Sequence, residues 1–146
     1  MQIISSTNIE QIKKQIKASK EKPIVVEGAD YEFNRKMLEY GKFDILLSPE
    51  KRGGKISLKK FDSGLNHISA KEAAKNSVAI GINPEELRKL NKKEKARRLF
   101  SIIRNIKFCR KAKAKIKILN YKDKKDALAF LISLGADTKQ AKEATE

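Results

Sequence analysis

The stretch FDSGLNH at residues 61–67 precedes an alanine-rich segment and then the apolar run VAIGI at residues 78–82. Ser63-Gly64 is typical of a turn. Asn66 is typical of a helix N-cap, because its side chain can accept a backbone N–H that the first helical turn leaves unpaired. The alanines predict a slim helix that packs close to a sheet, and the apolar run is typical of a buried strand. Turn, helix and buried strand in this order predict one unit of an α/β fold.

The same alternation of strand and helix extends in both directions from this unit. Asparagine, aspartate or threonine caps are predicted for the helices, with Thr138 expected to cap the last one. Alternation at this spacing gives parallel strands with right-handed helical crossovers. Periodicity alone allows either an open doubly wound sheet or part of a (β/α) barrel, with the working surface at the carboxyl ends of the strands in both. The other predicted strands cover residues 2–5, 23–27, 44–47 and 116–120.

The length of 146 residues predicts a single (β/α) domain over residues 1–146. Its longest predicted loop contains a lysine- and glycine-rich part, residues 51–60, which we expect to be a flexible basic segment. Gly53-Gly54-Lys55 in that segment resembles part of a phosphate loop, but Pro49 stands where the first glycine is required and Ile56 where the magnesium-binding hydroxyl is required. The segment is therefore interpreted as a solvated loop that can touch phosphates.

The charge of this chain is extreme, with a formal net value of +16. Self-repulsion at that level destabilises a compact state, and a polyanion relieves it. Nucleic acid is the leading predicted partner, an anionic membrane surface is the second, and a lysine-rich thermophile composition is the plain alternative.

The single cysteine and the hydropathy bear on the compartment. Cys109 has no second cysteine for an intrachain disulfide or a cysteine-based zinc cluster, and its helical position predicts a buried thiol. No apolar run approaches the ~20 residues that span a bilayer, and the N-terminus lacks a signal-peptide core. We therefore expect a soluble, cytoplasmic protein with no membrane partner.

The inventory of reactive side chains argues against an enzyme that works alone. One histidine and no cysteine cluster do not build a typical zinc site. Glu27, Asp44 and Asp62 lie near predicted strand ends or loops, but nothing in their spacing requires a magnesium ion. Ser63-Gly64 does not match the strained turn that carries a serine nucleophile. His67, at a predicted helix start, either bonds and packs locally or contacts RNA or a partner.

The long helix predicted from about residue 92 to 113 carries a more informative pattern. Residues 96, 99, 100, 103 and 106 are apolar and follow helical spacing, so we expect them to face the core. Cations stack beside that face, with an aromatic residue close by, which fits an RNA surface or a protein partner better than a merely solvated face. The cations of this stripe are Lys93, Arg97, Arg104 and Lys111, and the aromatic residue close to it is Phe108.

Five segments in order carry a resemblance to a known family. They are EFNRKMLE at 32–39, FDILLSP at 43–49, DSGLNHISAKEAA at 62–74, SVAIGINPEEL at 77–87 and KARRLFSIIRNIKFCRKAK at 95–113. Together they resemble ribonuclease P protein component 3, the archaeal counterpart of the eukaryotic thirty-kilodalton subunit. Members of that family usually begin with additional strand–helix units, so we expect an N-terminally shortened, incomplete TIM-barrel-like fold with about five strands and one unpaired sheet edge.

The resemblance implies an accessory protein that breaks no bond itself and binds no cofactor. In that family an RNA subunit, using Mg²⁺, removes the 5′ leader of precursor tRNA, and component 3 pairs with protein component 2 and other ribonuclease P proteins. The alternatives kept open are a stand-alone metal-dependent phosphoesterase on a related barrel and a general RNA- or ribosome-binding protein.

Two sets of residues are predicted to bind RNA or a partner. Those implied by the resemblance are Asn34, Arg35, Asp62, Ser63, Asn66, His67, Arg97, Asn105 and Lys107. Those chosen for charge and spacing are the cationic stripe and Phe108 named above and the basic segment, with Lys51, Arg52, Lys55, Lys59 and Lys60.

Overall fold

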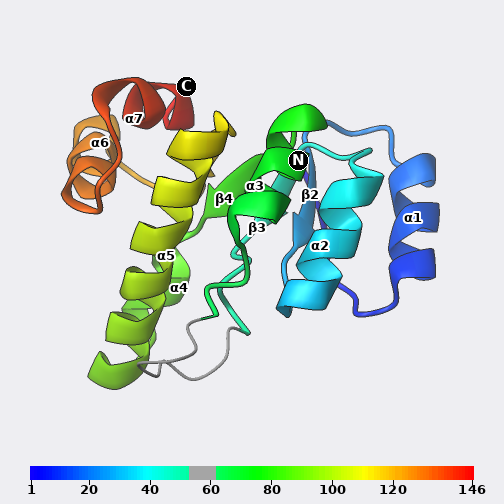
Figure 1. Ribbon diagram of the computed structural model, residues 1–146, viewed down its shortest axis with the longest axis horizontal. Coiled ribbons are helices and arrows are strands. Elements are labelled where there is room, and N and C mark those ends of the chain that lie inside the picture. The colour runs from blue at the N-terminus through cyan, green and yellow to red at the C-terminus, as the bar shows by residue number, and fades with distance from the viewer. Residues whose placement is uncertain (53–61) are drawn as a thin grey trace.

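Five parallel strands form one sheet in the computed structural model, which describes residues 1–52 and 62–146 (Figure 1). Their order in the sheet is their order in the chain. Within the part of the chain that the structure describes, β1 and β5 each pair with one strand, so the sheet is open, as predicted. The strands are β1 (Gln2–Ile4), β2 (Ile24–Glu27), β3 (Ile45–Leu47), β4 (Ala79–Ile82) and β5 (Ile116–Ile118).

Helices connect the strands and complete an α/β fold. In Figure 1, α5 lies between α3 on one side and the pair α6–α7 on the other, while α1 and α2 cover the opposite end of the sheet. The helices that the structure describes are α1 (Ile9–Ala18), α2 (Tyr31–Tyr40), α3 (His67–Lys75), α4 (Pro84–Arg88), α5 (Lys92–Ala112), α6 (Lys124–Ser133) and α7 (Thr138–Ala144).

Short polar side chains begin the helices. Asn66 caps α3 in a reciprocal capping box with Ser69, which confirms its predicted role. The expectation for the last helix was wrong, because Asp137 rather than Thr138 is its N-cap. The Asp137 carboxylate accepts from the backbone N–H of Gln140 at 2.8 Å, and the Gln140 side chain accepts from the Asp137 N–H in return.

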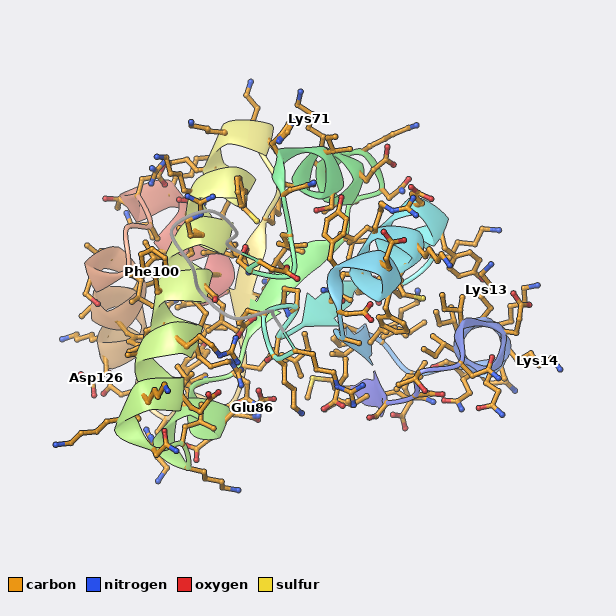
Figure 2. The ribbon with its side chains drawn as sticks, turned by 60° about the horizontal axis from the view of Figure 1, so that its bottom comes forward. Lys13, Lys14, Lys71, Glu86, Phe100 and Asp126 are labelled. Carbon is orange, nitrogen blue, oxygen red and sulfur yellow. The ribbon has the colours of Figure 1, made fainter. Side chains whose placement is uncertain are left out.

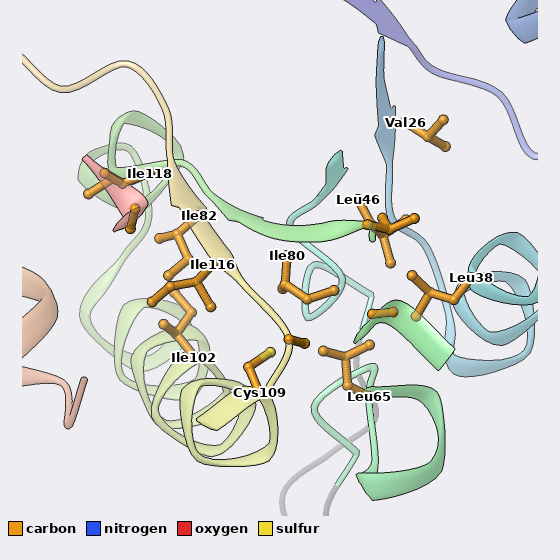
Figure 3. Packing of buried hydrophobic residues seen from close by; sticks show 14 of the residues in the cluster. Val26, Leu38, Leu46, Leu65, Ile80, Ile82, Ile102, Cys109, Ile116 and Ile118 are labelled. Carbon is orange, nitrogen blue, oxygen red and sulfur yellow. The ribbon is translucent and has the colours of Figure 1, made fainter. Parts of the chain in front are cut away.

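The main hydrophobic core lies between the sheet and its helices. Parallel register brings Ile4, Val26, Leu46 and Ile80 side by side on the helix-facing side of adjacent strands. Figure 3 shows Val26, Leu46 and Ile80 along the sheet, and Cys109 and Ile102 of α5 belong to the same core. The alternate strand residues form a smaller cluster on the other face, made of Val25, Ile45, Leu47 and Ala79.

Helix α5 is rotated relative to the prediction. Phe100 and Ile103, expected in the core, are 46% and 40% exposed, and Ala96 is exposed as well. Ile106 is buried and Leu99 packs against the core, as predicted, but the rest of the buried side follows another helical spacing and includes two large polar residues. Its members are Arg98, Ser101, Ile102, Asn105, Ile106 and Cys109. Apolar periodicity misled here because Arg98 and Asn105 find hydrogen-bond partners inside the fold.

Among the described residues, no helix combines the length and the apolar character needed to cross a bilayer.

The buried thiol of Cys109 gives a testable prediction. Burial raises its pKa to about 12, so almost none of the reactive thiolate is present at mildly alkaline pH. Iodoacetamide should modify Cys109 slowly in the folded protein and rapidly in guanidinium chloride, as followed by mass spectrometry. A Lys139→Cys variant supplies an exposed control thiol on α7. Equal rates at both positions in the folded protein would contradict the buried placement.

Candidate nucleic-acid interface

A close backbone contact lies at the carboxyl end of β3. Gly64 has a φ of 82°, and a Cβ at this position would lie 1.9 Å from the carbonyl oxygen of Pro49. Only glycine fits both the conformation and the space. Gly28, after β2, approaches Pro49 from another direction, where a Cβ would lie 2.6 Å from the Pro49 Cα. The turn predicted at Ser63-Gly64 therefore packs directly against the loop that leaves β3.

The side chain of Asn34 joins these loops. This α2 residue is fully buried, and its amide donates to the carbonyls of Pro49 and Gly64, both at 3.0 Å. Its oxygen accepts from the Ala29 N–H at 2.9 Å, and the amide also lies 3.3 Å from the Ala29 carbonyl. One amide thus satisfies backbone groups of the loops after β2 and β3 and of the turn before α3, which buried backbone requires.

Asn105 of α5 holds the same turn from the other side. Its amide donates to the Ser63 carbonyl at 3.0 Å, and its oxygen accepts from the Ser63 hydroxyl at 2.6 Å. The Asp62 carboxylate accepts from the Gly64 N–H at 2.8 Å, and the Asn66 amide donates to the Tyr31 hydroxyl at 2.8 Å. These side chains fix the chain where it enters α3.

A buried ionic cluster holds Glu50, which begins the segment that runs from residue 50 to residue 63. The Arg98 guanidinium donates to Glu50 from Nη2 and Nε, at 3.0 and 3.2 Å, and from Nη2 to Glu86 at 2.8 Å. The neighbouring Arg97 reaches the carbonyls of Glu50 and Lys51 at 3.5 and 3.4 Å. Helix α5 therefore holds both ends of the segment between residues 50 and 63.

Burial dominates the electrostatics of the pair Glu50 and Arg98. It raises the pKa of the Glu50 carboxyl, although the charge of Arg98 opposes that rise. Burial also pulls the pKa of Arg98 down, but the carboxylates of Glu50 and Glu86 together outweigh it and leave that pKa raised. A buried ion pair of this kind contributes little net stability, yet removing one partner leaves a charge with no compensation.

The exposed side of α5 carries cations around apolar side chains. The Arg104 guanidinium lies 5.3 Å from the centre of the Phe108 ring, a cation–π distance. Phe100 and Ile103 are exposed on the same helix, and Figure 2 shows Phe100 there and Lys71 on the neighbouring α3. The exposed cations of α5 include Lys93, Arg104, Lys107, Arg110 and Lys111.

The predicted binding residues fall into three groups in the structure. Asn34, Ser63 and Asn105 are buried and bonded to this chain, so any part they take in binding is through the loops they hold. The second group is half-buried and engaged within the chain. Arg35 pairs with Glu39 at 2.8 Å and Glu32 at 3.0 Å on its own helix. The contacts of the other members of this group are described above, for Asp62, Asn66, Arg97 and Phe108. The third group is exposed and comprises His67, at the first position of α3, with Lys51, Arg52, Lys93, Arg104, Lys107 and Lys111. Lys55, Lys59 and Lys60 lie outside the described residues.

Sequence reasoning missed the ionic cluster of Glu50, Glu86 and Arg98. The positions of Arg98, Ile102, Asn105 and Cys109 do follow helical spacing, so a buried polar face was visible in principle. It was passed over because arginine is almost never fully buried unless it is paired, and nothing local points to a partner 48 residues away.

Comparisons of the sequence with known proteins identify its relatives. No family model matches the chain. Ribonuclease P protein component 3 of Methanococcus maripaludis is 34% identical in strain C7 and 36% identical in strain C6, each over 110 residues or 74% of this chain. The protein of the same description from Methanocaldococcus jannaschii is 31% identical over 110 residues. The chain belongs to the ribonuclease P protein component 3 family.

The component 3 likeness extends to three dimensions. A chain in the cryo-EM structure of archaeal ribonuclease P with mature tRNA matches with a TM-score of 0.78 and 28% identity, over 97% of this chain and 62% of that one. The predicted TIM-barrel-like α/β class is therefore confirmed. The matched region makes up 44% of the length of the component 3 relatives named above.

The ionic cluster gives a prediction about stability and pH. Arg98→Ala leaves the Glu50 carboxylate buried without its partner, so the free energy of unfolding should fall by about 3–5 kcal/mol. A carboxyl whose pKa is raised by folding favours the folded state when protonated. The variant should therefore regain stability as pH falls from neutral toward the ordinary glutamate value near 4.5.

Urea unfolding at several pH values checks this prediction, with two controls. Arg97→Ala removes long hydrogen bonds to backbone carbonyls and an ion pair with Glu94 at 3.3 Å near the surface, and should cost about 1 kcal/mol. The double variant Glu50→Gln with Arg98→Ala should lose the added pH dependence, because its side chain at position 50 does not titrate. An Arg98→Ala protein as stable as the parent chain would show that the cluster is not buried as described.

Proposed function

We propose that this chain is an RNA-binding accessory subunit of ribonuclease P. In this role it supports the catalytic RNA in removing the 5′ leader of precursor tRNA and breaks no bond itself. Membership of the component 3 family carries the proposal, and the match to a chain of an archaeal ribonuclease P structure supports it. The net charge of +16 and the exposed cations of α5 supply the electrostatic attraction that RNA binding needs.

The surface of α5 is the proposed contact with RNA. Arg104 and Phe108 combine a cation with an aromatic face, and Lys107 and Lys111 lie one helical turn apart. Cations of this spacing contact successive phosphates, and aromatic side chains stack on unpaired bases. The predicted association with protein component 2 and other ribonuclease P proteins belongs to the same proposal, as does a cytoplasmic location.

A stand-alone metal-dependent phosphoesterase is the enzyme alternative. Such an enzyme needs carboxylates or histidines that converge on an ion. Within residues 1–52 and 62–146, no three His, Cys, Asp or Glu side chains come together as a possible metal site. A tightly bound, stoichiometric divalent ion in the purified protein, found by elemental analysis, would favour this alternative.

Reconstitution tests the proposal directly. The purified protein alone should leave precursor tRNA intact. Added to the catalytic RNA and the remaining proteins of an archaeal ribonuclease P from which component 3 is omitted, it should raise the rate of leader removal at low magnesium. Cleavage of the leader by the protein without any RNA subunit would overturn the accessory role. Co-purification with ribosomal RNA instead of ribonuclease P RNA would favour a general RNA-binding protein.

Salt dependence tests the α5 surface. Each phosphate contact contributes about 0.9 to the log–log slope of affinity against salt for duplex and about 0.7 for single strands. The double variant Lys107→Ala, Lys111→Ala should weaken RNA binding and reduce that slope by roughly one to two. The matched control Lys14→Ala, Lys17→Ala removes the same charge from exposed positions on α1, and Figure 2 shows Lys14 there. Equal effects of the two double variants would mean that only net charge matters.

A further inference from the structure

A cavity of about 420 Å³ opens where β4 and β5 end. Its walls come from α4, from the first half of α5, and from α6 with the loop that precedes it. It lies at the carboxyl ends of the strands, the side on which α/β folds place their ligands. The sequence did not single out this cavity, and the α5 surface described above does not account for it.

The walls of the cavity are mostly apolar and include two aromatic side chains. Leu87 of α4 and Leu99 of α5 line it together with Tyr121 and Phe130. The Tyr121 hydroxyl donates to the carbonyl of Thr145, the residue that follows α7, at 2.8 Å, and this bond holds the ring in place. Rings that are fixed before binding offer a stacking surface without a further loss of side-chain freedom.

Charged side chains from three elements surround these walls. Lys95 of α5 and Lys122 of the loop before α6 line the cavity, together with Arg88 of α4, which pairs with Glu85 at 2.8 Å. Carboxylates also line it, from Asp123 and Asp126. Asp123 is the N-cap of α6 and accepts from the backbone N–H of Asp126 at 3.1 Å.

We propose that this cavity receives one unpaired nucleobase of a single-stranded RNA segment. The base stacks on the ring of Phe130, with Tyr121 in the same cavity wall, and the adjoining phosphates meet Lys95 and Lys122. Unstacked bases are bound in this way, by aromatic faces and by hydrogen bonds to their edges. The proposal rests on the RNA binding proposed above and adds a defined site on the α6 side of α5.

The carboxylates give the site a preference among bases. Asp126 accepts hydrogen bonds but does not donate them when ionised. Cytosine presents an amino group at the position where uracil presents a carbonyl oxygen. A carboxylate attracts the first and repels the second, so cytosine should bind more tightly than uracil.

A protein side chain is the competing occupant of an apolar cavity. The observations favour RNA, because cations and carboxylates line the same apolar cavity, and a nucleotide offers phosphates to the cations and base amino groups to the carboxylates. An apolar anchor of a partner protein needs the walls but makes no use of these cations. The experiment below includes this occupant as an outcome.

Binding of short fluorescein-labelled oligocytidylate and oligouridylate to the full chain, measured by anisotropy, tests the proposal. Phe130→Leu keeps an apolar side chain but removes the stacking face, and should weaken binding at least about fivefold. Ile132→Ala changes an exposed apolar residue of α6 that does not line the cavity, and should leave binding within about twofold of the parent chain. Asp126→Asn should reduce the preference for oligocytidylate, because an amide offers both a donor and an acceptor.

Lys122 and Lys125 form a matched pair that separates local contact from net charge. Both are exposed and three residues apart, but Lys122 lines the cavity and Lys125 is not among its lining residues. Lys122→Gln should weaken binding more than Lys125→Gln. Ultraviolet cross-linking followed by mass spectrometry should place a cross-linked nucleotide on the peptide that contains Tyr121 or Phe130.

The outcomes distinguish this inference from the proposed function. If the chain binds RNA but Phe130→Leu binds as tightly as the parent chain, the nucleobase site is wrong while the accessory role stands. If Phe130→Leu weakens binding of protein component 2 and not of RNA, the cavity holds a protein side chain. If the parent chain binds neither oligonucleotide at low salt, direct RNA contact fails and the nucleobase site fails with it.

Discussion

The arrangement of the loops at the carboxyl ends of β2 and β3 depends on the buried amide of Asn34. Its two donor bonds bring the carbonyls of Pro49 and Gly64 to the same atom, although 15 residues of chain separate them from Asn34 in one case and 30 in the other. A buried carbonyl without a partner costs about 1–3 kcal/mol. The close approach of Gly64 to the Pro49 carbonyl leaves room only for glycine, and the Asn34 amide holds these same two residues together. Helix α2, the end of β3 and the start of α3 are therefore placed by one side chain.

Helix α5 provides the second support, and it does so with polar residues on a buried face. Arg98 and Asn105 lie seven residues apart, about 10 Å along the helix axis, and reach Glu50 and Ser63 respectively. Burying these groups demands that each be satisfied, and each of them is bonded within the fold. These two sets of hydrogen bonds fix the rotation of α5 about its own axis. That rotation turns Phe100 and Ile103 outward beside the cations of the proposed RNA surface.

Local signals predicted the strands, the helices and nearly all of the caps, because caps and alternation depend on residues a few positions apart. Asp137 took the place of Thr138 by a shift of one residue. The face of α5 could not be predicted in this way, since the burial of Arg98 depends on Glu50, far away in the sequence. Resemblance pointed to Asn34 and Asn105, but their buried positions required the structure. The cavity between α4, α5 and α6 was invisible for the same reason, because its walls come from separate elements.

The clamping of both ends of the segment between Glu50 and Ser63 bears on how its length and charge can vary. The groups that fix its ends belong to α2 and α5 and not to the segment itself. Lengthening a closed loop is thermodynamically mild, at about 0.6 kcal/mol for each doubling. Loop-closure entropy therefore opposes changes of length between the two anchored ends only weakly. A change in the number of lysines between the anchored ends alters the attraction to a polyanion without altering the contacts of Glu50 and Ser63 with α5.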